Sequence, residues 1–204
     1  MIEIRLNGKA VRLEHGTHLV HLEPGDEWSP ETGALRKGLV AGWRNDVAAL
    51  TELAHRRGAL LFLDAIQGLG QLPFDVRETP VDVLACGAQK WLLSPWGSGF
   101  TYVRRGLIER LEPPLAGWTA FDGTDDFETL CHYQGDWRGD ARRFELITLP
   151  FQDFHGMNES VGLLLELGIP AIREHLARVV QPVLEWADRR GIRVASPRGP
   201  HQSG

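Results

Sequence analysis

The order of the predicted elements indicates an α/β layered fold. Between residues 45 and 103 the sequence predicts a helix, a strand, a loop and two further strands. Residues 60–63 form an unbroken apolar run, which is typical of a parallel strand that is covered on both faces. From Met157 onward the apolar residues recur at helical spacing, so a helical region is expected to follow the sheet.

The first sixty residues predict a hairpin, a loop, a helix and a strand. Residues 1–20 alternate weakly, and Asn7 and Gly8 form a favoured two-residue turn. Residues 23–42 are rich in glycine, proline and charge, which predicts a loop. Asn45 or Asp46 is expected to cap a helix that ends at Gly58, and a strand over residues 59–63 follows.

The rest of the chain predicts two more strands and two helices. The strands cover residues 81–85 and 99–103, and residues 104–106 lead out of the second. One helix ends near Gly168, and the other spans residues 171–190, with a kink or break expected at Pro182. A further strand could begin at Val194.

Composition excludes several classes of protein. The chain has 204 residues, of which 43% are apolar and 24% charged, as in a globular domain. A net charge of −5 argues against a general nucleic-acid binder, and no apolar run is long enough to cross a bilayer. Two cysteines and no secretory signal favour the reducing cytoplasm.

Asp64 and Lys90 form the main chemical pattern. Asp64 closes the first apolar strand, and Lys90 lies just past the second. An acid and a lysine at neighbouring strand ends can hold a positively charged ring from one side and bond it covalently from the other. A pyridoxal phosphate site needs this pair: the lysine forms the Schiff base and the acid partners the pyridinium nitrogen.

The chain also resembles the class V aminotransferases, which include cysteine desulfurases and kynureninases. The resemblance is carried by the segments at residues 64–67, 89–91, 95–103 and 142–148, and it runs from about Gly42 to the end. It implies a fold-type-I enzyme: residues 1–150 are part of a three-layer α/β/α major domain, and residues 151–204 begin a helical α+β small domain. Residues 1–41 match poorly, and family members are about twice this length, so we expect an incomplete copy.

The resemblance also assigns roles to single residues. Lys90 is the expected catalytic residue, and the cofactor-binding residues are Asp64, Gln67, Gln89, Lys90 and Thr148. Gln67 is expected to donate to the phenolic oxygen of pyridoxal phosphate, and Thr148 to reach the phosphate held by the other subunit of a homodimer. Gln89 and Gly87 depart from the histidine and the serine or threonine usual in the family, so a backbone N–H at Gly87 or Ala88 is expected to replace the missing hydroxyl.

The function expected on these grounds is aminotransferase, desulfurase or lyase chemistry on a small amino-acid substrate. The alternative is a truncated, non-catalytic protein that keeps the fold but does not hold the cofactor. A Rossmann-type nucleotide binder ranks last, because no Gly-x-Gly-x-x-Gly follows a strand. No metal site is expected, since Cys131, His132 and His155 fit no zinc spacing.

Two further side chains are interpreted as structural. Cys86 ends an apolar strand, so it is expected to be a small buried residue rather than a sulfur carrier. Arg143 and Glu145 are expected to form a structural ion pair.

Overall fold

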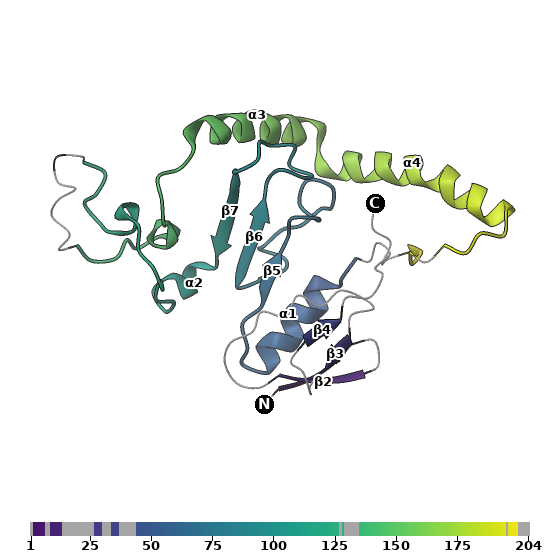
Figure 1. Cartoon of the computed structure of the whole chain (residues 1–204), viewed down its shortest axis with the longest axis horizontal. Coiled ribbons are helices and arrows are strands. Elements are labelled where there is room, and N and C mark those ends of the chain that lie inside the picture. The colour runs from purple at the N-terminus through teal and green to yellow at the C-terminus, as the bar shows by residue number, and fades with distance from the viewer. Residues whose placement is uncertain are drawn as a thin grey trace. The chain divides into compact units, whose positions relative to one another are not determined.

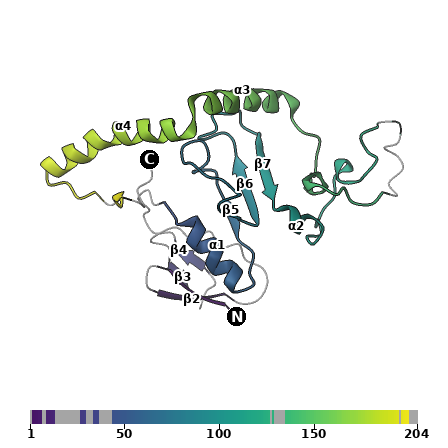
Figure 2. The same cartoon turned by 180° about the vertical axis from the view of Figure 1, so that it is seen from behind.

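The computed structural model of the chain is mixed α/β, which confirms the predicted fold class. It describes residues 2–6, 9–13, 27–29, 34–36, 44–126, 128, 135–194 and 196–199. Contacts divide the chain into two compact units, Met1–Ala59 with Pro170–Gly204, and Leu60–Ile169. This division does not test the predicted boundary between a major and a small domain near residue 150, so that boundary stays a prediction. Figures 1 and 2 show the elements from opposite sides.

The N-terminal part of the first unit contains two hairpins. Strands β1 (Ile2–Leu6) and β2 (Lys9–Leu13) pair antiparallel, and Leu6 opposite Lys9 is the last pair. This confirms the predicted pairing, while its Asn7–Gly8 turn lies outside the described residues. Strands β3 (Glu27–Ser29) and β4 (Ala34–Arg36) also pair antiparallel. The prediction of a loop over residues 23–42 is therefore wrong here, because strands of three residues are too short to show alternation.

Helix α1 (Val47–Arg56) begins and ends as predicted. The Asp46 side chain accepts a hydrogen bond from the Ala49 N–H at 3.0 Å, so Asp46 rather than Asn45 is the N-cap. His55 and Arg56 place basic side chains at the negative end of the helix dipole. Gly58 follows at φ +67°, a conformation that glycine adopts without steric cost.

The second unit is built on a three-stranded sheet in the order β5-β6-β7. Strand β5 (Phe62–Asp64) pairs parallel with β6 (Val83–Gly87), and β6 pairs antiparallel with β7 (Gly99–Val103). The predicted strand over 99–103 is confirmed. The first two strands begin two to three residues later than predicted, because Asp82 binds the Leu61 N–H at 2.7 Å through its side chain before the ladder begins.

The core lies between one face of this sheet and the segments that follow it. Helix α2 (Arg105–Ile108) contributes Leu107 and Ile108, which pack with Val103. The short 3-10 helices η1 (Trp118–Ala120) and η3 (Ala141–Phe144) come next, and Phe144 packs against the same cluster. Burial of these side chains stabilises the end of the sheet at which β7 finishes.

Asp82 fixes the amino end of β6. Its side chain is fully buried, and its Oδ1 accepts from the Arg104 guanidinium at 2.5 and 3.1 Å. The Asp82 carbonyl oxygen also accepts the Arg104 N–H at 2.9 Å. One aspartate therefore joins the chain before β5, the start of β6 and the exit from β7.

Two long helices follow. Helix α3 (Phe151–Leu167) ends at Gly168, and α4 (Ile169–Arg189) continues through Pro182. A break at Pro182 is therefore excluded, while the alternative of a kink stays a prediction. The proline removes the hydrogen bond to the carbonyl of Arg178, but both residues are exposed, so water can bond that carbonyl. Val194 and residues 196–199 are not in a strand, which contradicts the strand expected there.

Candidate active site

Asp64 and Lys90 lie at the same end of the sheet. Asp64 is opposite Ala85 in the parallel ladder, and the Ala65 N–H donates to the Ala85 carbonyl oxygen at 2.8 Å. Lys90 follows three residues after the end of β6. The carboxyl ends of neighbouring parallel strands are where open α/β sheets bind ligands. The structure therefore brings the predicted acid and the predicted lysine to one edge.

The Asp64 carboxylate caps a turn with one oxygen only. Its Oδ1 accepts from the Ile66 N–H at 3.0 Å, and the side chain is exposed. Its Oδ2 makes no hydrogen bond within the described part of the chain. The turn cap and a partner for a cationic ring can thus use different oxygens of the same carboxylate.

Gln67 lies on the turn after Asp64. Its side chain is exposed, and its backbone carbonyl oxygen accepts from Gln71 Nε2 at 2.7 Å. The backbone of Gln67 is thereby fixed while its amide group stays exposed. The predicted role toward the cofactor's phenolic oxygen stays a prediction.

The segment between β6 and β7 is a closed loop. The Ala88 N–H donates to the Ser98 carbonyl oxygen, the Ser94 N–H to the Ala88 carbonyl oxygen and the Leu93 N–H to the Lys90 carbonyl oxygen, each at 3.0 Å. The Lys90 side chain is exposed at the start of this loop. The backbone of the lysine is therefore fixed, while its amine is accessible.

Gly87 and Gln89, the two positions that differ from the usual family residues, lie next to each other. A Cβ atom on Gly87 would lie 2.7 Å from Gln89 Oε1 and 3.0 Å from Ile66 Cδ1. The Gln89 amide thus occupies the space that a side chain at position 87 would need. The Ala88 N–H donates to the Ser98 carbonyl oxygen, so Ala88 does not replace the missing hydroxyl, while the alternative of the Gly87 N–H stays a prediction. The Gln89 atom nearest that space is the amide oxygen, which accepts hydrogen bonds, and the donor of this side chain is its Nε2.

Cys86 is buried behind this edge, as the sequence analysis predicts. Burial, followed by the charge of Asp64, raises the pKa of the Cys86 thiol. Its Sγ contacts the Ala65 carbonyl oxygen at 3.8 Å. A protonated, buried thiol is a poor nucleophile, so Cys86 acts as packing.

Thr148 lies apart from the four residues at the sheet edge. It is exposed, and its Oγ1 accepts from Trp118 Nε1 at 3.2 Å. The expected ion pair between Arg143 and Glu145 is not found among the described residues. Instead the Arg143 guanidinium lies over the Trp137 ring, 5.6 Å from its centroid, where the cation meets the negative face of the indole.

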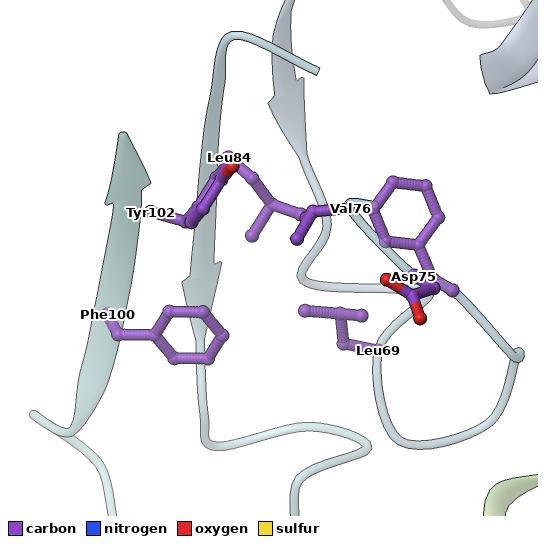
Figure 3. Close-up of a pocket in the computed structure, with 7 residues that line it drawn as sticks. Leu69, Asp75, Val76, Leu84, Phe100 and Tyr102 are labelled. Atoms are coloured by element: carbon purple, nitrogen blue, oxygen red, sulfur yellow. The ribbon is translucent and has the colours of Figure 1, made fainter. Parts of the chain in front are cut away.

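An apolar cavity lies on the other face of the sheet. It has a volume of about 300 Å³ and is lined by Leu69, Phe74, Asp75, Val76, Leu84, Phe100 and Tyr102. Figure 3 shows Leu84, Phe100 and Tyr102 from β6 and β7 facing Leu69 and Val76 from the preceding loop. Directly paired residues share a face, so Asp64 lies with Ala85 on the face opposite Leu84. The cavity is therefore separate from the Asp64 edge.

The sequence analysis missed the support that α3 gives to the lysine loop. Ser94 Oγ and Ser160 Oγ are 2.8 Å apart, and a Cβ on Gly156 would lie 2.8 Å from Pro95 Cγ. The available signal was the small residues Gly156 and Ser160, four positions apart and hence on one helix face. In Figures 1 and 2, α3 runs across the end of the sheet where β6 finishes and β7 begins.

Comparison with known proteins identifies the family. The model of the family "Aminotransferase class-V" matches residues 38–200. The "Uncharacterized aminotransferase YcbU" of Bacillus subtilis (strain 168) is 33% identical over 163 residues, which are 80% of this chain and 42% of that protein. The chain therefore belongs to the class-V aminotransferase family. It spans about two fifths of the length of this relative.

Solved structures show the same fold. The apo structure of a cysteine desulfurase from Thermococcus onnurineus NA1 matches with a TM-score of 0.67 at 23% identity, covering 79% of this chain and 39% of that one. A variant of C-DES with glycine covalently linked to its PLP cofactor matches with a TM-score of 0.58 at 20% identity, covering 71% and 37%. The sheet described above is thus part of an α/β domain that these enzymes share.

Other possible sites were also considered. Within the described residues no group of three or more His, Cys, Asp and Glu side chains is placed to hold a metal ion. Cys131 and His132 lie outside those residues. No helix in the described ranges is long and apolar enough to span a bilayer.

The donor set at the Asp64 edge fits pyridoxal phosphate. Lys90 supplies an accessible amine, Asp64 a carboxylate with an available oxygen, and Gln67 and Gln89 supply amides. A lysine, an acid and amide donors match the aldehyde, the ring nitrogen and the oxygens of that cofactor in turn.

Proposed function

We propose that this chain carries the lysine and the ring-binding acid of a pyridoxal phosphate-dependent enzyme that acts on an amino acid. The observation that supports this most is the placement of Asp64 and Lys90 past paired parallel strands, joined by the Ala65 to Ala85 hydrogen bond. Membership of the class-V aminotransferase family supports the same reaction class.

The residues have distinct tasks in this proposal. Asp64 Oδ2 is the oxygen for the ring nitrogen, since Oδ1 caps the turn at Ile66. Lys90 would hold the cofactor through its amine and would move the α-proton of the substrate as a general acid and base. Gln89 donates its amide to the phosphate, and Gln67 donates to the phenolic oxygen. The cofactor itself acts as the electron sink for the substrate carbanion.

Aminotransferase, desulfurase and lyase chemistry all use these residues. Because Cys86 is buried and its pKa is raised, we do not assign it the sulfur-accepting role that a desulfurase requires. Among the described residues the site therefore favours proton transfer at the substrate α-carbon, a step common to transamination and elimination.

Covalent labelling tests the proposal. The full chain is mixed with pyridoxal phosphate, reduced with borohydride and mapped by peptide mass spectrometry. The label is expected on Lys90 and absent from Lys90→Ala. A label on Lys9 or Lys37 would contradict the assignment. A chain that takes up no cofactor would support the alternative of a protein that keeps the fold without the chemistry.

We further propose that the site is completed across a homodimer, with Thr148 of one copy facing the Lys90 loop of the other. Thr148 is exposed, and its neighbours Leu146 and Ile147 expose 50% and 70% of their surface. Phe151, at the start of α3, is also exposed. Contiguous exposed apolar side chains are typical of a protein interface.

A further inference from the structure

The loop that carries Lys90 is held in place by helix α3. We propose that Ser94 and Ser160 are positioning residues for Lys90, because their hydrogen bond keeps the intervening loop in a conformation that it would otherwise leave. The inference rests on the proposed function only for the cofactor-binding role of Lys90. The hydrogen bond between Ser94 of the loop and Ser160 of α3, called the clamp below, does not depend on the proposed function.

The loop contains an unfavourable backbone conformation at Leu93. Its φ is +56°, and it is the one residue other than glycine with a positive φ in the described ranges. The left-handed region brings a Cβ atom too close to the backbone carbonyl, so leucine rarely adopts it. The Leu93 side chain is 61% exposed, so its own packing does not compensate. Some other contact must hold this conformation.

Ser94, the next residue, supplies that contact. Its N–H donates to the Ala88 carbonyl oxygen at 3.0 Å, and its Oγ donates to the Leu92 carbonyl oxygen at 2.9 Å. Each hydroxyl has one proton, and Ser160 Oγ also lies 3.1 Å from the Met157 carbonyl oxygen, so Ser160 donates to Ser94 across 2.8 Å in the arrangement in which Ser94 donates to Leu92 and Ser160 does not donate to Met157. The helix hydroxyl thereby completes a network that surrounds Leu93 on both sides. Ser94 is buried, so loss of this donor would leave its oxygen poorly satisfied.

The shape of α3 agrees with this role. Gly156 lies against Pro95, where a Cβ would come within 2.8 Å of the proline ring. A Cβ on Gly97, which has φ +95°, would be 3.2 Å from Asp153 Oδ2. Asp153, Gly156 and Ser160 are spaced three and four residues apart, so they share one helix face. That face is the one in contact with the loop.

Lys90 is coupled to this network through its backbone. The Leu93 N–H donates to the Lys90 carbonyl oxygen at 3.0 Å. If Leu93 relaxes to a negative φ, the following Ser94 N–H cannot keep its geometry toward the Ala88 carbonyl oxygen, and the loop that contains Lys90 opens. The side-chain amine of an exposed lysine is placed mainly by that backbone.

Two measurements on the full chain test the inference. Ser160→Ala is compared with Glu159→Ala, an exposed neighbour on α3. Hydrogen exchange at the Leu93 and Ser94 amides, without cofactor, is expected to rise about tenfold in Ser160→Ala only, as for the loss of one hydrogen bond. The rate of pyridoxal phosphate capture by Lys90 is expected to fall in the same variant. Ser160→Thr, which keeps a hydroxyl, is expected to restore both. Leu93→Gly, which removes the strain, is expected to reduce the effect of Ser160→Ala on capture.

The outcomes separate the clamp from the function. Unchanged exchange in Ser160→Ala overturns the inference, whether or not the chain binds pyridoxal phosphate. Faster exchange with unchanged capture at Lys90 shows a structural clamp and overturns the positioning role. If the unmodified chain captures no cofactor, the proposed function fails and the exchange result alone decides whether the clamp exists. If Ser160→Ala does not fold, Ser94→Ala is measured in its place.

Discussion

Gln89 folds back onto Gly87, so that a Cβ atom on the glycine would lie 2.7 Å from Gln89 Oε1. Residue 87 must be small for the Gln89 amide to occupy this space. Gly87 and Gln89, the two positions that depart from the usual family residues, therefore share one space, and a side chain at position 87 would displace the Gln89 amide.

Gln89→Ala is expected to weaken binding of pyridoxal phosphate by about 10- to 100-fold, the range for a hydrogen bond to a charged group. Binding of pyridoxal, which lacks the phosphate, is expected to change little. Gln67→Ala is the matched control, since it should weaken both ligands equally. Titration of the visible absorption band with each ligand gives the dissociation constants. Equal losses for the two ligands in Gln89→Ala would remove its phosphate role.

Gly87→Ser is expected to displace the Gln89 side chain, because the new Cβ needs the space of the amide oxygen. The fold should survive, since the clash is with the end of a flexible side chain. The double variant Gly87→Ser with Gln89→His, which restores the usual family pair, is expected to bind pyridoxal phosphate more tightly than Gly87→Ser alone. Additive effects in this double-mutant cycle would show that the two positions are independent.

Asp64→Asn is expected to keep the fold and lose turnover by about two orders of magnitude or more, as for loss of a preorganised charge at the reacting group. Asparagine can still accept the Ile66 N–H through its side-chain oxygen, but it carries no charge for the ring nitrogen. Asp64→Ala also loses the turn bond, which adds about 1 kcal/mol of destabilisation. Steady-state kinetics and urea unfolding separate the two effects. An Asn variant of normal activity would leave Asp64 as a turn cap alone.

Asp82→Ala is expected to destabilise the chain by about 1–3 kcal/mol, because it leaves the Leu61 N–H without its partner and removes an ion pair whose Arg104 side chain is 40% exposed. Asp82 is fully buried and joins three segments through Leu61 and Arg104. Asp75→Ala breaks a pair in which the Arg77 side chain is exposed, and it should change stability much less than Asp82→Ala. The midpoints of urea unfolding give both values. Similar losses in the two variants would show that the Asp82 network is not the stronger one.

Cys86 is expected to resist thiol reagents until the protein unfolds. Its raised pKa keeps the thiol protonated in the folded state at pH values where a free cysteine ionises. The unfolded state therefore gains thiolate first, so the stability contributed by Cys86 is present below the ordinary thiol pKa and falls as pH rises above it. Reaction with Ellman's reagent between pH 7 and 10, with and without urea, measures this. Rapid labelling of the folded chain at neutral pH would contradict the buried, protonated state.

Ile147→Asp is expected to dissociate the proposed homodimer, since it places a charge within the exposed apolar segment next to Thr148. Sedimentation velocity should show dimers for the unmodified chain and monomers for the variant. Leu163→Asp, at an exposed leucine on α3, is a control for the added charge. A stable monomer in the unmodified chain would count against the shared site.

The sequence predicted those parts of the fold that depend on local pattern. The capped helix at Asp46, the strand over 99–103 and the common edge of Asp64 and Lys90 follow from caps, apolar runs and the parallel-strand rule. The strands β3 and β4 could not be predicted, because three residues carry too little pattern. The contact of Arg143 with Trp137 in place of Glu145 depends on how distant segments pack, which spacing does not specify.

In the candidate site, too, local pattern predicted some features and contacts between distant segments determined others. Residue identity and spacing predicted which side chains are candidates for the chemistry. They did not indicate that Ala88 is already hydrogen-bonded to Ser98, or that α3 reaches Ser94. Both facts arise from tertiary contacts between residues that are well separated along the chain.

The loop between β6 and β7 closes on itself where Gly87 pairs with Gly99 and Ala88 bonds to Ser98. Lys90 lies two residues after Ala88, on the β6 side of this closed loop, whereas Trp96 lies two residues before Ser98, on the β7 side, and exposes 81% of its surface. An insertion or deletion near Trp96 would therefore change the outer contour of the protein without altering the number of bonds between the lysine and the sheet. Variation in chain length at this point would alter that contour while the Ala88 to Ser98 hydrogen bond keeps the base of the loop closed.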